Sequence, residues 1–435
     1  MKALHKLILW SGLLAAPAVI AQIPTHTVAT TEDQEATGFA DSRKAVRDIV
    51  TGRLYVAYRA KYKESGTTNY RIFVKYSDDA GSTWSLCNAG LPIDTEGSYK
   101  QRVPSIAIGP DSARTLHLVW YGLEPGNQEN QREIKYSRST DQCGTWSAAR
   151  RITNDSGFDA TTYSYWQEHP VVLAYGDFVY IAWEGRDGST TNGGVRLIRS
   201  VDRGVTFEAS QFVSRWSGYS FSRPAIVAIG PSATPTLWLV AFAYDASDAS
   251  NPRKIYWTKS ADAGVTWPDW ARVCPSCSGD QRHVSMSRDT NGKAHIAWRE
   301  NDASGYSQIF YAKSTTSSFG TPVQVAQASM YQFSPQVEVD QAKSNQVYVI
   351  WSQTSNAAGF PSEKPTDGYL YYATKADADL GFGAAQQLTS DGYATYPTWR
   401  RTAKTLDGNL DYVWTAYPNG SLSTIFNVDH SYLPR

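Results

Sequence analysis

Basic and aromatic side chains recur at one position of this sequence, immediately before strand-like segments that often begin with proline. The two residues before each such segment are, in chain order, Arg43 and Lys44, Arg102 and Val103, Glu168 and His169, Ser222 and Arg223, Arg282 and His283, Phe333 and Ser334, and Thr395 and Tyr396. Seven unrelated surface pairs would rarely collect four arginines and two histidines. Since arginine offers a rigid fork of donors that matches carboxylate or sulfate, the set predicts an anionic ligand.

One reaction that suits these residue types is β-elimination from a uronic acid polymer. It needs a group that neutralises the carboxylate, a base for the C5 proton and an acid for the leaving oxygen, and Arg, His and Tyr can fill these roles. His169 or His283 would act with Arg223 and with Tyr396 or Tyr219. We expect no cofactor to be required.

Two tryptophans and the number of carboxylates near these positions further restrict the expected ligand and reaction. Trp166 and Trp399 stand beside them and are suited to stack on sugar rings. Glu168 is the one carboxylate in the set, so hydrolysis by a pair of carboxylates is not expected. The alternative is that these polar residues only fill a wet channel and bind exposed strand ends. The predicted ligand is an acidic oligo- or polysaccharide.

A repeated phrase indicates how residues so far apart in the chain are brought together. Ser77–Trp84, Ser200–Phe207 and Ser260–Trp267 follow the pattern S-x-D-x-G-x-T-aromatic, and Ser139–Trp146 keeps it with the Gly one place later. Asp can bond backbone N–H groups and Gly tolerates positive φ, so each copy predicts a tight turn after a strand. Structural roles are therefore expected for Asp79, Gly81, Asp141, Asp202, Gly204, Asp262 and Gly264.

The phrase resembles the Asp-box (BNR) repeat of the sialidase-like proteins, in which the box joins the third and fourth strands of a β-propeller blade. Sialidases bind the sialic acid carboxylate with three arginines and use a Tyr activated by a Glu as nucleophile. The resemblance places these roles on Arg102, Arg223 and either Arg43 or Arg282, and on Tyr396 and Glu168. The Phe-Arg-Ile-Pro signature of that family has no true counterpart here, and sialidases have six blades.

A second repeat counts the blades. The apolar runs are Leu54–Tyr58, Leu116–Trp120, Val179–Trp183, Leu237–Ala241, Ala294–Trp298, Val347–Trp351 and Leu410–Trp414. Their spacing of about 60 residues predicts an all-β, seven-bladed propeller of four-stranded antiparallel blades, with a six-bladed sialidase-type ring as the alternative. Residues 22–435 are expected to form this single domain, and Thr25–Thr31 to supply the strand that the last blade lacks.

The four cysteines suit an oxidising compartment. Cys87 and Cys143 lie beside turns of neighbouring blades, which predicts a disulfide between them. For Cys274 and Cys277 three interpretations stand: a local disulfide, a structural zinc site that also uses His283, or a redox motif.

The N-terminal sequence and the charge balance indicate where the protein is located and which classes of partner are expected. Residues 1–21 combine Lys2 and Lys6 with an apolar run, a secretory signal pattern, so a secreted or periplasmic protein is expected. The 41 basic and 41 acidic residues cancel, which gives no reason to expect nucleic acid or a membrane as partner. We expect a monomer.

Three hypotheses of function follow. The first is a sialidase-like glycosidase that recognises and cleaves an acidic glycan. The second is a polysaccharide lyase acting on uronic polymers, because seven-bladed ulvan lyases perform that reaction on a propeller. The third is a glycan-binding or adhesive propeller without catalysis.

Overall fold

The structure, a computed structural model, describes most of the chain. The described residues are 24–39, 42–64, 66–94, 100–123, 132–153, 166–186, 193–214, 218–245, 253–355, 368–390, 394–399, 410–416 and 426–433. The predicted signal peptide, residues 1–21, lies outside them and stays a prediction. Within this part no helix is long and apolar enough to cross a membrane.

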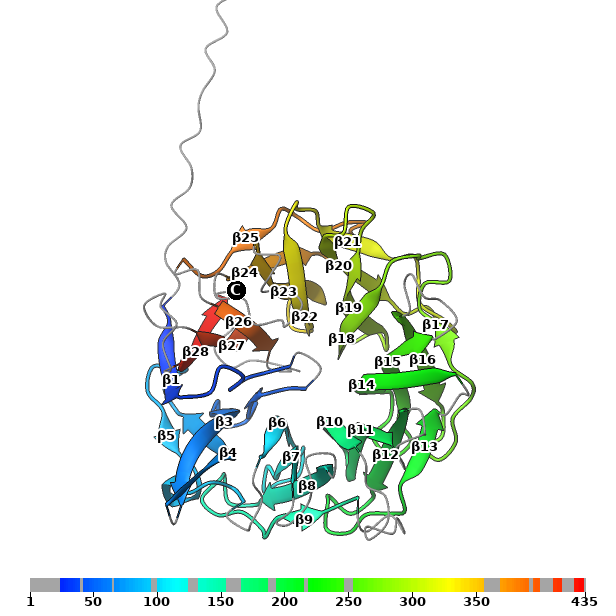
Figure 1. Cartoon of the computed structure of the whole chain (residues 1–435). Helices are drawn as coiled ribbons and strands as arrows, with labels where there is room; N and C mark the ends of the chain where they lie inside the picture. Colours follow the sequence, from blue (N-terminus) through cyan, green and yellow to red (C-terminus); the bar gives the residue numbers. More distant parts are fainter. Residues whose placement is uncertain are drawn as a thin grey trace, which may run out of the picture.

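The described strands form seven antiparallel four-stranded sheets arranged as a ring around a central opening (Figure 1). The innermost strands are β2 (Ala45–Arg47), β6 (Arg102–Ile108), β10 (Trp166–Tyr175), β14 (Tyr219–Ile229), β18 (Gln281–Arg288), β22 (Tyr331–Asp340) and β26 (Ala394–Trp399). The second strands are β3 (Leu54–Glu64), β7 (Leu116–Leu123), β11 (Phe178–Arg186), β15 (Thr236–Asp245), β19 (Ala294–Asn301), β23 (Gln346–Thr354) and β27 (Leu410–Ala416). The seven-bladed propeller predicted from the repeats is confirmed.

The outer half of each blade follows the same order. The third strands are β4 (Thr67–Ser77), β8 (Arg132–Ser139), β12 (Gly194–Ser200), β16 (Arg253–Ser260), β20 (Ser307–Lys313), β24 (Tyr369–Lys375) and β28 (Phe426–Leu433). The outermost strands are β5 (Ser85–Leu86), β9 (Arg150–Arg151), β13 (Gln211–Ser214), β17 (Ala271–Arg272), β21 (Val323–Ala326), β25 (Gln386–Gln387) and β1 (His26–Thr31). A 3-10 turn, Asn88–Gly90, is the one helical element among the described residues.

The ring is closed by the two ends of the chain. The N-terminal strand β1 pairs antiparallel with β28, from His26 opposite His430 to Thr31 opposite Phe426 (Figure 1). The segment expected to complete the last blade therefore does so, and the seam between first and last blade is hydrogen-bonded like the others.

The hydrophobic core lies between neighbouring blades. The second strands are buried on both faces, and their closing tryptophans Trp120, Trp183, Trp298, Trp351 and Trp414 are among the largest fully buried side chains. One cluster, for example, joins Val46 and Ile72 of the first blade to Ile106 and Leu118 of the second. This explains why the second-strand sequences are continuous apolar runs rather than alternating ones.

A β-bulge interrupts six of the seven inner strands near their start. Register shifts lie between Arg102 and Ser105 and at the equivalent places of β10, β14, β18, β22 and β26. The bulged residues Val103, His169, Arg223, His283 and Ser334 all have φ between +50° and +54°. An extra residue in one strand re-aims the side chains beside it. A positive φ at a residue other than Gly costs of order 1–3 kcal/mol. Such residues are concentrated at functional sites.

The repeated S-x-D-x-G-x-T phrase forms one kind of turn. In the first copy Thr83 donates to Asp79 from both its backbone N–H and its hydroxyl, at 2.8 and 2.6 Å, and Ser77 accepts from the Gly81 N–H at 2.8 Å. Gly81 has φ +92°, and a Cβ there would lie 2.1 Å from the His430 ring of the preceding blade. Glycine is therefore required by both the backbone and the packing.

The fourth copy places Cys143 where the other copies have this Gly, at φ +73°. Its sulfur bonds to Cys87 of the first blade, so the predicted disulfide is confirmed and joins two neighbouring blades. The strained conformation of Cys143 coincides with a covalent link that holds the turn in place.

We predict that these turns lose stability in acid. Hydrogen bonds from Thr83 lower the pKa of Asp79 to about 2. At Asp202 and Asp262 burial opposes the shift, but Thr and backbone donors still bring the pKa to about 2. The stabilisation is therefore complete above the ordinary value of 3.8 and disappears as the pH falls through about 2.

Asp202→Ala should lower the free energy of unfolding by about 1–2 kcal/mol at neutral pH and by much less near pH 2. Urea unfolding of both proteins at the two pH values measures this. An equal difference at both would contradict it.

Candidate functional site

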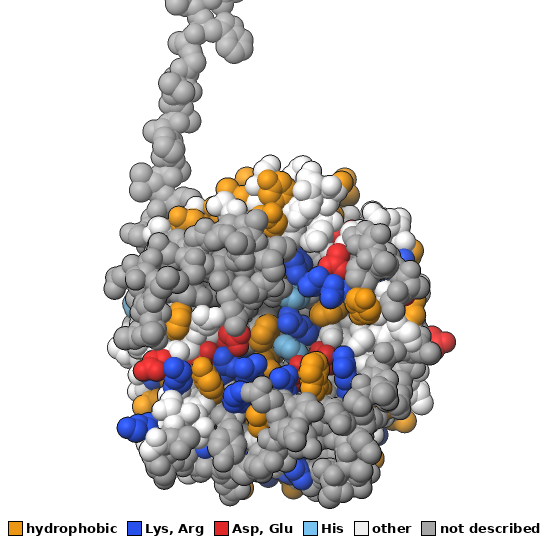
Figure 2. All heavy atoms as spheres, viewed as in Figure 1, with side chains coloured by type: hydrophobic (Ala, Val, Ile, Leu, Met, Phe, Trp, Pro, Cys, Tyr) orange, Lys and Arg blue, Asp and Glu red, His pale blue; other side chains and the backbone are white. Residues whose placement is uncertain are grey.

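The candidate site lies at the mouth of the channel where the inner strands begin, which we call the top face. The bulges of the six strands place their residues there, so the predicted His169, Arg223 and His283 share one structural position in three successive blades. Figure 2 shows this face, with Lys and Arg side chains around histidine at the centre of the ring.

The centre of the mouth is a cluster of four residues, the central cluster: Phe39, His169, Arg223 and His283. Arg223 Nη1 lies 2.7 Å from His283 Nε2. The guanidinium also lies over the Phe39 ring, 4.6 Å from its centroid, and the Phe39 and His169 rings meet edge to face at 5.0 Å. Because arginine has only donors, Nε2 of His283 is the acceptor and carries no proton in this arrangement. The Arg223 cation thus contacts the His283 imidazole and the Phe39 ring, and the His169 imidazole contacts the same ring.

Phe39 reaches the axis on the segment Glu32–Phe39, the N-terminal strap, which connects β1 to β2. Arg59 holds the strap through ion pairs to Asp33 and, at 3.0 Å, to Glu35. Thr37 is fixed by hydrogen bonds to Thr415 of the last blade, at 2.7 and 3.0 Å. The strap is thus tied to both blades at the seam, and Phe39 itself adopts φ +97°. Backbone strain of this kind is common at residues that form a functional site.

A second group of positive charges, the blade 2–3 cluster, flanks the central one: Arg102, Tyr121, Arg132, Glu168 and Arg186. Arg132 forms an ion pair with Glu168, and Arg102 lies opposite Tyr121 in the sheet. Burial raises the pKa of Tyr121, although Arg102, Arg132 and Arg59 oppose the shift. No acid among the described residues forms an ion pair with Arg102 or Arg186. The cluster therefore keeps positive charge for an anionic ligand.

Trp166 joins this cluster to the outside of the mouth. Its ring is flanked by Arg132 at 5.3 Å and Arg186 at 4.8 Å from the ring centroid. Two cations against one indole fix the orientation of the ring. Its edge position at the start of β10 suits the sugar-stacking role that the sequence predicted for Trp166.

Three predicted ligand residues lie elsewhere or outside the described side chains. Arg43 is the correction: its guanidinium crosses the channel to the Met286 carbonyl at 2.6 Å and to Glu338 at 3.3 Å, away from the top face. The three described pairs between β2 and β3 show no register shift, and Arg43 lies lower in the channel than its counterparts. Tyr396 and Trp399 lie on β26, but their side chains are outside the described part of the chain.

Arg282 and Glu168 keep their place near the mouth but have acidic or basic partners of their own. Arg282 is bound to Asp280 at 2.8 Å, beside Arg253. Glu168, besides its pair with Arg132, lies 3.9 Å from His169 Nε2. Both therefore flank the central cluster rather than complete it.

The remaining cysteines also form a disulfide, one of the three interpretations left open for them. Cys274 and Cys277 are bonded at 2.02 Å, which is the disulfide alternative for this pair. Zinc binding by these cysteines with His283 would need the bridge to be reduced, and the His283 ring faces Arg223 instead.

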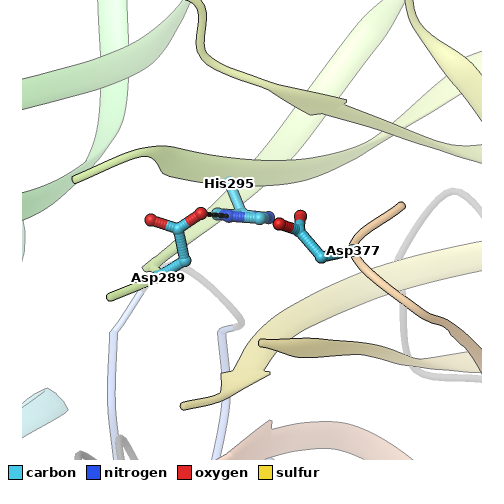
Figure 3. A group of neighbouring side chains, drawn as sticks. All are labelled: Asp289, His295 and Asp377. Atoms are coloured by element: carbon cyan, nitrogen blue, oxygen red, sulfur yellow. Dashed lines mark ion pairs between the residues drawn. The ribbon is translucent and has the colours of Figure 1, made fainter. Parts of the chain in front are cut away.

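A group that resembles a metal site lies between the fifth and sixth blades, just beyond the end of β18. Asp289, His295 and Asp377 bring ligand atoms within 4.8 Å of one another, with the histidine between the two carboxylates (Figure 3). Lys313 contacts both carboxylates, at 3.3 Å from Asp289. Its ammonium supplies the positive charge that a metal would bring.

The contacts around this group indicate that it links two neighbouring blades. His295 Nδ1 lies 2.7 Å from the Tyr311 hydroxyl, as His117 does from Tyr136 at 2.8 Å in the second blade. Burial lowers the pKa of His295, although Asp289 opposes the shift. Burial resists ionisation of Asp289, yet His295, the Lys293 backbone and Lys313 bring its pKa to about 2. The histidine and the ion pairs of Lys313 thus link the fifth and sixth blades.

The sequence-based choice of residues missed four members of the site: Phe39, Tyr121, Arg132 and Arg186. Phe39 lies on a connecting segment without a repeat of its own. The other three lie at the top ends of second and third strands, where β7, β8 and β11 meet β10. A search of those strand ends, as well as the inner-strand starts, would have found the two arginines.

No protein-family model and no curated protein matches this sequence. Among solved structures, an ulvan lyase described as a new family of polysaccharide lyase, bound to a glucuronic acid and sulfated rhamnose unit, is 12% identical over 93% of this chain and 94% of its own, with a TM-score of 0.59. A protein of unknown function from Dyadobacter fermentans is 14% identical over 77% and 96%, with a TM-score of 0.52. A sialidase from Streptococcus pneumoniae is 14% identical over 94% of this chain and 70% of its own, with a TM-score of 0.47. Such low identities show a shared fold, and glycan-active propellers are among its users.

We predict that Phe39 positions the central cluster. Phe39→Ala removes the ring beside His169 and should shift the His169 imidazole resonances in an NMR titration, because the ring current and the edge contact are lost. Phe178→Ala, which removes a ring stacked on Tyr180 at the other end of the blade, should leave those resonances in place. Unchanged His169 signals in Phe39→Ala would contradict this role.

We also predict that the Asp289 group needs Lys313 and no metal. Lys313→Met should lower the free energy of unfolding by about 2 kcal/mol, because two carboxylates lose their shared cation. Lys313→Arg is the matched control and should stay near wild type. Dialysis against a chelator should not change Tm, and a clear drop in the Tm of the chelated wild type would show that a metal is bound.

Proposed function

We propose that the top face binds an acidic glycan and that the protein cleaves a uronic acid polymer by β-elimination. The observation that carries this proposal is the contact of Arg223 with His283 at 2.7 Å, with His169 against the same Phe39 ring that Arg223 covers. The Arg223 guanidinium can donate two hydrogen bonds to one carboxylate, and an imidazole nitrogen that accepts a hydrogen bond can act as a base.

The reaction follows from these groups. Arg223 turns to the uronate carboxylate and stabilises the charge that develops there when the C5 proton leaves. Nε2 of His283, freed from the guanidinium, takes that proton. The C4–O bond then breaks as the C4–C5 double bond forms, and a Tyr gives its proton to the leaving oxygen. We assign that role to Tyr396, which stands at the bulge of β26 as His283 stands at that of β18.

The surrounding charges support an extended acidic polymer as the substrate. The blade 2–3 cluster adds Arg102 and Arg186 beside Trp166, so a stacked sugar there has cations for a second anionic group. The neighbour with the highest quoted TM-score is bound to an alternating uronic acid and sulfated sugar. Its fold, although not its sequence, is shared by this chain.

Sialidase-like hydrolysis has weaker support. It needs three arginines on one carboxylate, whereas Arg43 lies lower in the channel and Arg282 is bound to Asp280. We further propose an exported monomer, since two disulfides suit an oxidising compartment.

We predict that the purified protein releases unsaturated product from ulvan, detected by its ultraviolet absorbance. Arg223→Ala should lower kcat/KM by about 10²–10³, because one preorganised charge contact is lost. His283→Ala should cost about 10²–10⁴ through loss of the base. Arg203→Ala, which only breaks a rim ion pair with Asp177, is the control and should stay at wild-type rate.

Three results would overturn the lyase assignment. Ulvan and other uronic polymers left intact, with binding on a glycan array, would indicate a glycan-binding propeller. Turnover of a fluorogenic sialoside would indicate the hydrolase. Arg223→Ala with wild-type binding and turnover would remove the site itself.

A further inference from the structure

The central channel contains a second hollow, at the end where the inner strands finish. We call it the axial chamber. Its volume is about 370 Å³, and it is lined by residues from six of the blades, including Val46, Ile106, Val172, Ile226, Ser287 and Glu338. A volume of this size is in the range of small-molecule sites. It is independent of the top face and of the function proposed for it.

The chamber is separated from the top face by a narrow waist. Between the two lies a cavity of about 20 Å³, bordered by Val171, Ala225 and Met286, which has room for about one water molecule. Arg43 borders both hollows and spans the channel through its bonds to Met286 and Glu338. A ligand of the chamber therefore enters from the bottom face.

The walls of the chamber are more apolar than a water channel needs. Val46, Ile106, Ile108, Val172 and Ile226 present aliphatic surface, and Ile49 at the rim is 36% exposed. Replacing water at an apolar wall with an apolar group lowers the free energy. The chamber is thus suited to a ligand with an aromatic or aliphatic body.

Three of the four arginines that line the chamber form ion pairs with described carboxylates. Arg47 pairs with Asp411 at 2.7 Å, Arg114 with Asp48 at 2.8 Å, and Arg43 with Glu338 at 3.3 Å. This leaves one guanidinium of the lining without a carboxylate.

That guanidinium is Arg288. It donates to the Ala228 carbonyl at 3.0 Å and to the Tyr175 hydroxyl at 3.2 Å, and it lies over the Tyr175 ring. No acid within the described part of the chain forms an ion pair with it. It is therefore a positioned cation with its charge uncompensated at the chamber wall.

We propose that the axial chamber is a binding site for a small organic anion with an apolar body, such as an aromatic carboxylate or sulfonate. Arg288 binds the anionic group, and the aliphatic walls of β6, β10 and β14 cover the body. The ligand lies across the axis and contacts most of the blades, so its binding stabilises the ring.

The test uses anilinonaphthalene sulfonate, a dye that has this chemistry and fluoresces when bound. The mature full-length protein should bind one dye molecule saturably and gain Tm with it. Arg288→Met should weaken binding about tenfold or more, because a charge-assisted contact is lost. Ala174→Phe should weaken it by filling the chamber. Arg53→Met, which loses an ion pair with Asp78 and a contact with the Tyr76 ring outside the chamber lining, is the control and should bind as wild type.

The uncharged analogue phenylnaphthylamine should bind wild type and Arg288→Met alike, and more weakly than the sulfonate binds wild type. The proposal is overturned if Arg288→Met and Ala174→Phe both bind the sulfonate like wild type, or if the two dyes bind wild type equally well. Far-ultraviolet circular dichroism and Tm of each variant establish that it is folded. Lyase activity is not a readout here, so its absence would not affect the result.

Discussion

The site depends on one backbone device, the β-bulge at the start of the inner strands. Two residues there oppose one on the second strand, and the bulged residues described adopt positive φ in five blades. This places His169, Arg223 and His283 at the same height around the axis although they are 54 and 60 residues apart. Without the ring the three side chains would have no common neighbour.

The electrostatics follow from that geometry. The chain carries no net charge, yet the top face gathers cations, since inner and second strands of several blades point arginines to one mouth. The acids that balance them are used on the strap and along the walls of the channel, where Asp33 binds Arg59 and Glu338 binds Arg43. The result is a neutral protein with a locally positive mouth above and a positive chamber below.

The repeats were sufficient to predict the fold, because a phrase and an apolar run recur once per blade and each has a physical reason. Blade number, the closing strand and the Cys87–Cys143 bridge follow from them. The site was predicted in part. His169, Arg223 and His283 share a repeat position, which the sequence shows, but Arg43 was misplaced because its height in the channel depends on how Lys44 and Ala45 pair with β3, and the residue types do not reveal that pairing. Phe39 was missed because its contacts depend on where a non-repeated strap crosses the seam.

The most direct test of this account is a crystal structure of the protein with a uronic acid oligosaccharide. The account predicts a uronate carboxylate within hydrogen-bond distance of the Arg223 guanidinium, with the C5 carbon facing His283 or His169 and a neighbouring sugar against Trp166. An oligosaccharide bound at the outer rim, or at the top face with its carboxylate turned to solvent, would contradict it.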